Sequence, residues 1–222
     1  MTLRPRRSVL YLPGSNARAI EKARSLPADG IILDLEDAVA PDAKADARKQ
    51  VVEAVKAGGF GAREVFVRVN GIDTPWHADD MNAAAHAAPD AILVPKISDF
   101  EQVEMMGRRL LDMSTDHKTR IWAMIETPFA ILNIRDIAAA AKDSETRLSG
   151  FVLGTNDLAN ETGARIVPGR APMLSWLSTC ILAARAFGIA ILDGVYNDLS
   201  NAKGFADECA QARDLGFDGK TL

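Results

Sequence analysis

The stretch GIILDLEDAV, residues 30–39, shows most directly which fold this chain adopts. Its first half is a continuous run of isoleucine and leucine, which is typical of a strand that is covered on both faces. Its second half places three carboxylates, Asp34, Glu36 and Asp37, within four residues. The stretch therefore predicts a strand of a parallel sheet that ends at a charged rim.

The same kind of unit recurs along the whole chain: a short apolar run, a polar or glycine-containing break, and then a longer amphipathic segment. The apolar runs cover residues 8–14, 30–37, 64–70, 91–96, 120–126, 150–157, 189–194 and 217–222. The amphipathic segments, which we predict to be helices, cover residues 15–26, 43–58, 99–113, 128–142, 171–188 and 201–216, and an alanine-rich patch at 83–89 also fits a helix. Strands that alternate with helices in this way indicate parallel β/α units.

Eight such units favour a (β/α)8 TIM barrel over an open doubly wound sheet. An open sheet more often has about five or six parallel strands and a glycine-rich phosphate turn. The sequence contains neither GxGxxG nor GxxxxGK[ST]. Because no linker or low-complexity tract divides the chain, we expect one barrel domain over residues 1–222.

The composition excludes several classes of partner. The net charge is −4, and no cluster of Lys and Arg could follow a nucleic-acid backbone. No apolar segment approaches the roughly 20 residues that cross a bilayer, and the basic start runs into Pro13 and Gly14 without the apolar region of a secretory signal. We therefore expect a cytoplasmic protein that binds neither nucleic acid nor membranes, with Cys180 and Cys209 as buried structural thiols in helices.

The informative residues of a parallel barrel lie where each strand stops, because the active sites of such barrels form at the carboxyl ends of the strands. Polar side chains stand at this position in most of the apolar runs. They are Glu36, Asp37, Arg68, Asn70, Lys96, Glu126, Asn156, Asp157 and Asp193. We expect all of them to line one rim.

Glu126 and Asp157 are the leading candidates for a metal site. They end neighbouring strands of the predicted barrel, and no histidine or thiol lies near either in the sequence. Carboxylate oxygens suit Mg²⁺ or Mn²⁺, which keep water and substrate oxygens in their remaining positions. The alternative is structural: Glu126 would interact with the dipole of the helix that follows it, and Asp157 would be a helix N-cap.

Arg68 is the candidate for binding an anion. It lies between VFV and VNG at the rim, where its guanidinium group can bind a carboxylate through two hydrogen bonds. The alternative is a salt bridge to Glu36 or Asp37, and both roles can hold at once. Lys96 is either a substrate contact or a member of a structural ion pair. The three histidines lie in a polar helix or a charged loop, so we expect none of them to be a ligand or a base.

Seven motifs, in order along the chain, carry a resemblance to a known family. They are RSVLYLPGSNARAIEKA (7–23), GIILDLEDAVAPDAKADAR (30–48), VFVRVNG (65–71), ILVPK (92–96), MIETP (124–128), GTNDLANETG (154–163) and AILDGVYND (190–198). Together they resemble the citrate lyase β-subunit branch of the HpcH/HpaI aldolase and CoA-ester lyase family. The ordered set is far more specific than any one motif.

The resemblance implies a TIM barrel that binds Mg²⁺ through Glu126 and Asp157 and cleaves a 3-hydroxyacyl-CoA thioester between its α- and β-carbons. In that reaction the metal polarises the forming carbonyl group, and Arg68 offsets the charge on the thioester enolate. Glu36 and Asp37 are the nearby candidates to take the hydroxyl proton. Their other possible role is to orient Arg68 and metal-bound water.

Arg18 and Lys22, one turn apart on the first predicted helix, resemble family positions that meet the phosphates of CoA. The alternative is that they are solvated charges on a helix surface. Family chains continue past the eighth strand, and in several relatives that region delivers an acidic residue to the active site of a neighbouring subunit. The sequence stops at Leu222, so we expect a barrel that lacks its eighth helix and C-terminal extension. It would then be a truncated form, a natural short form, or a protein weak in catalysis.

These observations predict a Mg²⁺-dependent CoA-ester lyase of citrate lyase β type, which converts a citryl-CoA type substrate to acetyl-CoA and a 2-oxo acid such as oxaloacetate. Many relatives are trimers or hexamers, so we expect a homo-oligomer. A malyl-CoA or citramalyl-CoA lyase is the alternative among enzymes. A barrel subunit that binds ligands without catalysis is the alternative of another class.

Overall fold

The computed structural model describes residues 4–222, in which eight parallel strands form a closed barrel in sequence order. The strands are β1 (Ser8–Pro13), β2 (Gly30–Asp34), β3 (Glu64–Arg68), β4 (Ala91–Val94), β5 (Arg120–Ile125), β6 (Leu148–Leu153), β7 (Ala190–Asp193) and β8 (Gly219–Thr221). The barrel closes where β8 pairs with β1, through Ser8 with Lys220 and Val9 with Thr221. The predicted TIM barrel is confirmed, and the open sheet is excluded.

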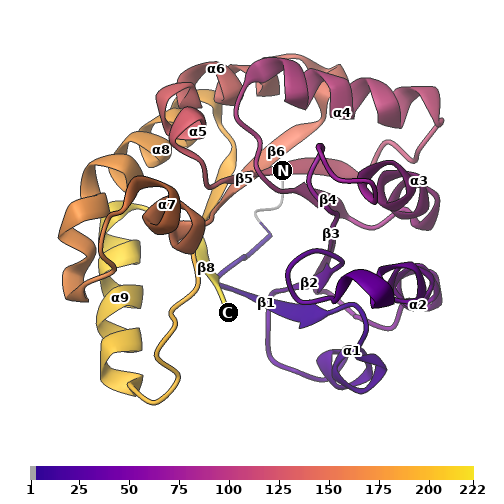
Figure 1. The fold of residues 1–222 in the computed structure, drawn as a ribbon, viewed down its shortest axis with the longest axis horizontal. Helices are drawn as coiled ribbons and strands as arrows, with labels where there is room; N and C mark the ends of the chain where they lie inside the picture. The colour runs from indigo at the N-terminus through magenta and orange to yellow at the C-terminus, as the bar shows by residue number, and fades with distance from the viewer. Residues whose placement is uncertain (1–3) are drawn as a thin grey trace.

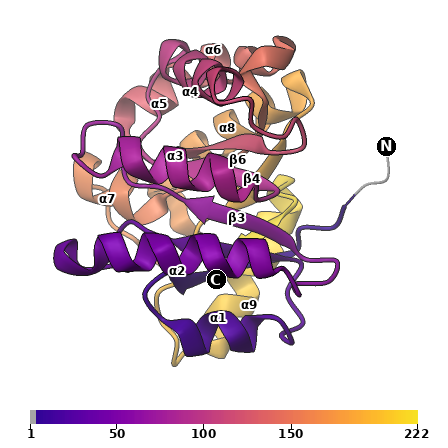
Figure 2. The same ribbon diagram turned by 90° about the vertical axis from the view of Figure 1, so that its right-hand side faces the viewer.

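Helices surround the strands (Figure 1), and α1 to α4 follow one another along one side of the barrel (Figure 2). They are α1 (Ala17–Ala23), α2 (Lys44–Ala57), α3 (His77–Ala87), α4 (Phe100–Asp112), α5 (Pro128–Leu132), α6 (Ile134–Ala139), α7 (Thr155–Thr162), α8 (Leu174–Phe187) and α9 (Ala202–Leu215), with short 3-10 helices η1 (Pro41–Ala43), η2 (Ala140–Lys142), η3 (Ser144–Thr146) and η4 (Pro168–Met173). Within residues 4–222, none of these helices is both long and apolar enough to span a bilayer.

Side-chain caps explain where several helices begin. Asn16, Asp99 and Asn201 each accept a hydrogen bond from the backbone N–H three residues later, which satisfies one of the free donors at a helix start. The single helix predicted over 128–142 is wrong, because the chain breaks at Asn133 into α5 and α6. The Asn133 side chain donates to the Ser98 carbonyl oxygen at 2.9 Å, a contact with a distant loop.

The two cysteines lie in helices as predicted, but they differ in burial. Cys180 in α8 is buried, whereas Cys209 in α9 is only partly covered. The expectation of a buried structural thiol is therefore confirmed for Cys180 alone.

Two apolar cores stabilise the barrel. The larger core lies between the strands and the helices, and a smaller one fills the interior of the barrel. In the interior, the rings of Phe66 and Trp122 pack edge to face, with centroids 5.1 Å apart. Inward-facing side chains alternate along a strand, so the inward positions of Ile32 and Phe66 imply that Asp34 and Arg68 also point inward, one layer nearer the carboxyl end.

The observed strands end earlier than the predicted runs. Glu36, Asp37, Asn70, Lys96 and Glu126 therefore lie in the loops that follow the strands. This places them above the apolar interior, at the end of the barrel where strands give way to loops.

Candidate active site

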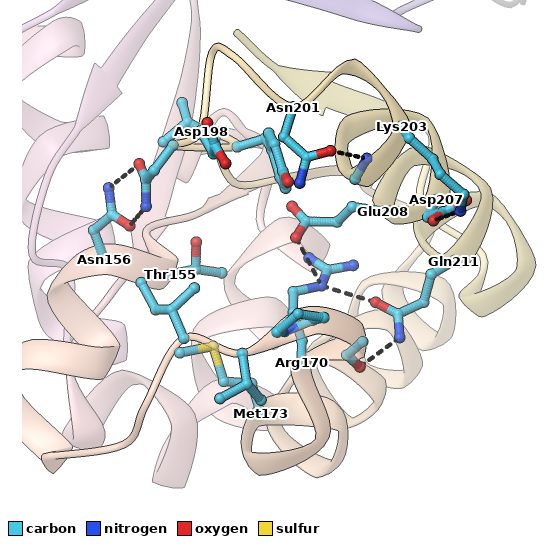
Figure 3. A pocket seen from close by; sticks show the side chains of 18 residues that line it. Thr155, Asn156, Arg170, Met173, Asp198, Asn201, Lys203, Asp207, Glu208 and Gln211 are labelled. Atoms are coloured by element: carbon cyan, nitrogen blue, oxygen red, sulfur yellow. Dashed lines mark hydrogen bonds and ion pairs between the residues drawn. The ribbon is translucent and has the colours of Figure 1, made fainter.

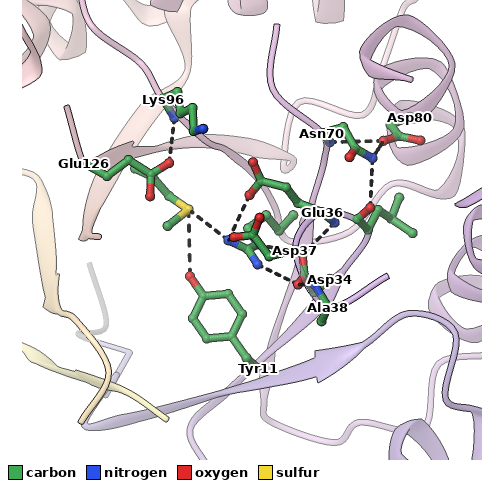
Figure 4. Close-up of polar contacts among 12 residues, drawn as sticks. Tyr11, Asp34, Glu36, Asp37, Ala38, Asn70, Asp80, Lys96 and Glu126 are labelled. Carbon is green, nitrogen blue, oxygen red and sulfur yellow. Dashed lines mark hydrogen bonds and ion pairs between the residues drawn. The ribbon is translucent and has the colours of Figure 1, made fainter. Parts of the chain in front are cut away.

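Asp34, Glu36 and Asp37 lie close together at the carboxyl end of the barrel (Figure 4), and all three contact Arg68. The register of β2 and β3 places Asp34 and Arg68 opposite each other. Arg68 Nε and Nη2 each donate to one oxygen of the Asp34 carboxylate, both at 2.6 Å. Both side chains are buried, and a two-point contact of this kind fixes the plane of the guanidinium group. The sequence prediction placed Asp34 on the strand but missed it as the main partner of Arg68.

Asp34 also holds the loop over residues 35–39. Its two oxygens accept hydrogen bonds from the backbone N–H groups of Glu36, at 2.9 Å, and Ala38, at 3.1 Å. One buried carboxylate thus orients both the guanidinium group and the backbone that carries the next two acids.

Glu36 and Asp37 both contact Arg68 from this loop, as the sequence indicates. Arg68 Nη1 lies 2.9 Å from Glu36 Oε2 and 3.3 Å from Asp37 Oδ2. The Glu36 side chain is 13% exposed and that of Asp37 is 73% exposed. Burial raises the pKa of Glu36 to about 8, and the positive charge of Arg68 only partly opposes this effect. Glu36 is therefore suited to exchange a proton near neutral pH.

Tyr11 and Met124 form the apolar side of the Arg68 environment. The Arg68 guanidinium carbon lies 5.0 Å from the centre of the Tyr11 ring, and Met124 Sδ lies 3.8 Å from Arg68 Nη1. Burial lowers the pKa of Arg68, but the hydrogen bonds and charge of Asp34 outweigh it and raise the pKa well above its ordinary value. Arg68 is therefore a permanent cation. Alternation along β1 and β5 would have identified Tyr11 and Met124 as inward residues.

Glu126 and Asp157 lie at the ends of neighbouring strands, since Glu126 directly follows β5 and Asp157 lies in the first turn of α7 after β6. The N-cap alternative for Asp157 is wrong, whereas the interaction of Glu126 with the dipole of α5 stays an alternative, because Glu126 directly precedes the N-cap of that helix. Thr127 caps α5 through its side chain, and Gly154 occupies the N-cap position of α7. A Cβ atom at Gly154 would collide with the Glu126 side chain, so glycine is required there for the carboxylate to fit.

The charges of this pair favour a bound cation. Burial, and then the negative charge of Asp157, raise the pKa of Glu126 to about 7. Two hard oxygen donors suit Mg²⁺, which commonly takes one or two carboxylates and completes its shell with water and substrate oxygens. No cluster of three or more potential metal-binding His, Cys, Asp or Glu side chains occurs in residues 4–222. Two carboxylates at neighbouring strand ends would leave the remaining positions of such a metal to water and ligand oxygens.

Lys96 acts on the site through its backbone. Its side chain is exposed, whereas its N–H donates to Glu126 Oε1 at 2.8 Å. The backbone of Lys96 has a positive φ of 56°, which is uncommon for a residue other than glycine. The sequence prediction considered only the ammonium group and so missed this contact.

Arg18 and Lys22 both lie on α1 and are exposed. Neither lines the cavity beside Arg68. The structure therefore places both side chains on the outside of the barrel, on the helix that follows β1. Their contact with CoA phosphates stays a prediction.

A cavity of about 380 Å³ opens beside Arg68. Its lining includes Tyr11, Asp37, Arg68, Met124 and Asp157. The cavity is large enough for a small organic acid or acyl group, which would meet the guanidinium group of Arg68 and the carboxylates of Asp37 and Asp157.

A larger cavity of about 530 Å³ lies next to it, between η4 and α9 (Figure 3). The two cavities share Thr155, Asn156 and Val195 in their linings. Asn156 and Asn197 bond to each other across the shared part through both carboxamides, at 2.8 and 3.1 Å. Four of the charged side chains that line the larger cavity form ion pairs, Arg170 with Glu208 and Lys203 with Asp207, whereas Asp198 accepts hydrogen bonds from Ser200.

Asp193, which we predicted at the open rim, is fully buried in a second group of charges, and that prediction is wrong. Arg170 Nη1 donates to both Asp193 oxygens, at 2.7 and 2.8 Å, and Lys220 Nζ donates to Asp193 Oδ2 at 2.8 Å. Lys220 also donates to Glu208 at 2.7 Å. We call Arg170, Asp193, Glu208 and Lys220 the balanced cluster, because it holds two cations and two anions.

Asn70 is a second residue that the structure moves away from the open rim. It is buried, and its carboxamide nitrogen donates to the Leu35 carbonyl oxygen at 2.8 Å and to Asp80 at 2.5 Å. The polar residues that do gather around the smaller cavity and the metal position form what we call the rim cluster. It consists of Asp34, Glu36, Asp37, Arg68, Glu126 and Asp157.

Comparisons with known proteins identify the family of this chain. A family model described as HpcH/HpaI aldolase/citrate lyase matches residues 7–222. A (3S)-malyl-CoA thioesterase of Cereibacter sphaeroides is 49% identical over 218 residues, which cover 98% of this chain and 73% of the relative. Citrate lyase subunit beta of Escherichia coli strain K12 is 34% identical over 224 residues, which cover 99% of this chain and 73% of the relative. A crystal structure of CitE from Mycobacterium tuberculosis in complex with magnesium, acetoacetate and coenzyme A has a TM-score of 0.81 and 29% identity, over 99% of this chain and 77% of that chain.

Proposed function

Because this chain belongs to the HpcH/HpaI aldolase/citrate lyase family, we propose that it is a Mg²⁺-dependent enzyme that cleaves the CoA thioester of a small hydroxy acid, with malyl-CoA as the leading substrate. The 49% identity to a (3S)-malyl-CoA thioesterase supports a malyl group over the citryl group that the sequence motifs favour. The complex of a relative with magnesium, acetoacetate and coenzyme A supports the class of ligand.

The observation that carries this proposal is the excess of negative charge in the rim cluster. The cluster holds five carboxyl groups and one guanidinium group, that of Arg68, which contacts three of them directly. Burying unbalanced charge is costly, and a cation bound beside the buried Glu126 would lower that cost for its ionised form. Glu126 and Asp157 are the two acids that Arg68 does not pair with directly, and we assign the Mg²⁺ to them.

When bound, Mg²⁺ would act as a Lewis acid toward the hydroxyl and carboxylate oxygens of the acyl group. The residues of the chain itself supply the rest. Arg68 is held rigidly by Asp34 and lines the cavity, so it is placed to stabilise negative charge on the thioester oxygen. Glu36, with a pKa of about 8, is the better candidate to accept the hydroxyl proton, and the exposed Asp37 is the alternative.

Carbon–carbon cleavage is the first candidate reaction. Removal of the hydroxyl proton would break the bond between the α- and β-carbons, and the electron pair would pass to the thioester as an enolate. Protonation of the enolate carbon then gives acetyl-CoA, with glyoxylate as the other product of malyl-CoA. Thioester hydrolysis is the second candidate, favoured by the activity named for the 49% identical relative. Water would add to the thioester carbon, and CoA would leave as the thiol. Both reactions place negative charge on the thioester oxygen, so the role of Arg68 is common to them.

One experiment separates the two reactions. The purified chain is incubated with malyl-CoA and Mg²⁺, and acetyl-CoA, glyoxylate, malate and free CoA are quantified by chromatography. Equal amounts of acetyl-CoA and glyoxylate indicate a lyase, whereas equal amounts of malate and free CoA indicate a hydrolase. Citryl-CoA and citramalyl-CoA in parallel reactions test the acyl group.

The matched variants are Glu126→Gln, which removes one proposed metal ligand, and Glu53→Gln, which changes an exposed glutamate on α2. Turnover and Mg²⁺ affinity are expected to fall in the first variant only. Absence of cleavage of all three thioesters by the unaltered chain would overturn the proposed function, and the chain would then be better described as a ligand-binding barrel.

A further inference from the structure

Lys44 is the first residue of α2, and its side chain is hydrogen-bonded to the backbone of the loop that carries Glu36 and Asp37. Its Nζ donates to the carbonyl oxygens of Leu35 and Glu36, both at 2.9 Å, and to Asn70 Oδ1 at 2.7 Å. An ammonium group has three donors, and all three are used here. The side chain is buried, and it does not line the cavity beside Arg68.

All three acceptors of Lys44 are uncharged, which is unusual for a buried cation. Asp80, the carboxylate that accepts from the Asn70 side chain, is instead paired with Arg48 Nε at 2.6 Å. Trp76 covers the ammonium group, with its ring centre 5.0 Å from Lys44 Nζ. A buried charge that lacks a carboxylate partner stabilises a fold poorly, so stability alone gives weak reason for a lysine at this position.

The rim cluster gives a better reason. The backbone that Lys44 holds is the backbone that places Glu36 and Asp37 against Arg68. Asp34 binds the same loop through its N–H groups, because its carboxylate accepts hydrogen bonds from Glu36 and Ala38.

We infer that Lys44 is a positioning residue of the proposed reaction. It fixes residues 35 and 36 so that Glu36 and Asp37 keep the geometry around Arg68 in which the proton transfer occurs. This inference rests on the proposed function. Because Lys44 does not touch the cavity, its effect on the reaction passes through the loop.

Lys44→Met removes the three donors and the charge. It is expected to lower kcat by about 10- to 100-fold, as loss of a supporting contact commonly does, while KM changes by less than about 3-fold because no substrate contact is lost. Lys44→Arg keeps the charge and several donors, so it should recover part of the loss. It also serves as the test variant if Lys44→Met does not fold.

Two control variants separate positioning from general damage. Lys49→Met changes an exposed lysine on the same helix that lies 3.3 Å from Asp46, and kcat is expected to stay within about 2-fold. Leu110→Ala destabilises the outer core at α4 without touching the loop. All variants are compared at a temperature where each is folded, with active sites counted by calorimetric titration of Mg²⁺ and pyruvate. A kcat loss that follows stability, and appears equally in Leu110→Ala, would overturn the inference.

Hydrogen exchange gives a measure that does not depend on activity. Amide exchange over residues 35–39, followed by mass spectrometry, should accelerate in Lys44→Met and remain unchanged in both controls. Unchanged exchange overturns the inference, and so does faster exchange with unchanged kcat. If the unaltered chain cleaves no thioester, the proposed function and the catalytic part of this inference fail, while the exchange rates still decide whether Lys44 holds the loop.

Discussion

The rim cluster and the balanced cluster are built from the same kinds of side chain, and both lie at the carboxyl ends of barrel strands. They differ in charge balance. In the balanced cluster, Arg170 and Lys220 face Asp193 and Glu208, so that every charge has an opposite partner. The rim cluster holds five carboxyl groups and one cation, Arg68, which pairs directly with three of them.

Charge balance helps to distinguish charged residues that stabilise the barrel from charged residues that bind a ligand. Buried ion pairs that satisfy one another join elements of the fold and leave nothing for a ligand. An unbalanced group shifts pKa values and attracts a counter-ion or substrate. Glu36, with a pKa of about 8, and Glu126, with a pKa of about 7, both lie in the rim cluster.

The largest effect is expected from breaking the balanced cluster. Asp193→Ala leaves Arg170 and Lys220 buried without their shared acceptor. The free energy of unfolding should fall by about 3–5 kcal/mol, because an unpaired buried charge is strongly unfavourable, while kcat of the folded fraction changes little. Urea unfolding measures the loss, with Asp112→Ala, at an exposed position, as the control. A stable but inactive Asp193→Ala protein would assign the balanced cluster to catalysis instead.

The next largest effect tests the rim cluster. Arg68→Lys keeps a positive charge but cannot reproduce the two-point contact with Asp34 together with the contact to Glu36. We expect kcat for malyl-CoA cleavage to fall by about 10²–10³-fold, which is the usual cost of losing one donor to a developing oxyanion. Arg108→Lys, on the outer surface of α4, is the control. Full activity of Arg68→Lys would show that only charge is needed at this position.

A smaller effect concerns the pH dependence of stability. The pKa of Glu36 in the folded chain, about 8, lies above its ordinary value. The folded state therefore binds this proton more tightly than the unfolded state, so the stabilisation is complete below the ordinary pKa and is lost as the pH rises through about 8. In EDTA, the free energy of unfolding should fall by about 1–3 kcal/mol between pH 6 and 9. Urea titrations should show a flatter profile for Glu36→Gln, and an identical slope would contradict the raised pKa.

The smallest effect is expected on the wall of the larger cavity. Lys203 forms an exposed ion pair with Asp207 at 2.5 Å, one turn along α9. Lys203→Met should change the free energy of unfolding by less than about 0.5 kcal/mol, because exposed pairs contribute little, and should leave kcat within about 2-fold. Thermal unfolding and steady-state kinetics measure both. A large loss of turnover would bring the larger cavity into the substrate site.

The sequence predicted the fold well because its signals are local. Each strand is a short apolar run, and the closed barrel follows from their number and alternation with helices. The helix predicted over 128–142 failed because the break at Asn133 depends on a hydrogen bond to Ser98, which lies 35 residues away in the chain. No pattern within the segment contains that information.

The site was predicted less completely, for the same reason. Glu126 and Asp157 could be paired because neighbouring strands bring them together. The environment of Asp193 could not be predicted, because its partners come from η4 and from β8. Lys96 was considered as a side chain, whereas its contribution comes from a backbone N–H in a left-handed conformation. Contacts between distant segments and unusual backbone angles both lie outside what spacing can show.

Closure of the barrel between its last strand and its first affects how the chain is made on the ribosome. β1 cannot gain its second neighbour until β8 (Gly219–Thr221) has emerged from the exit tunnel. At typical translation rates, that interval is ~10–40 s. During that time the N–H and C=O groups on one edge of β1 are open to pairing with another chain or to capture by a chaperone. The strand that later carries Tyr11 into the cavity wall is therefore an exposed edge of the nascent chain.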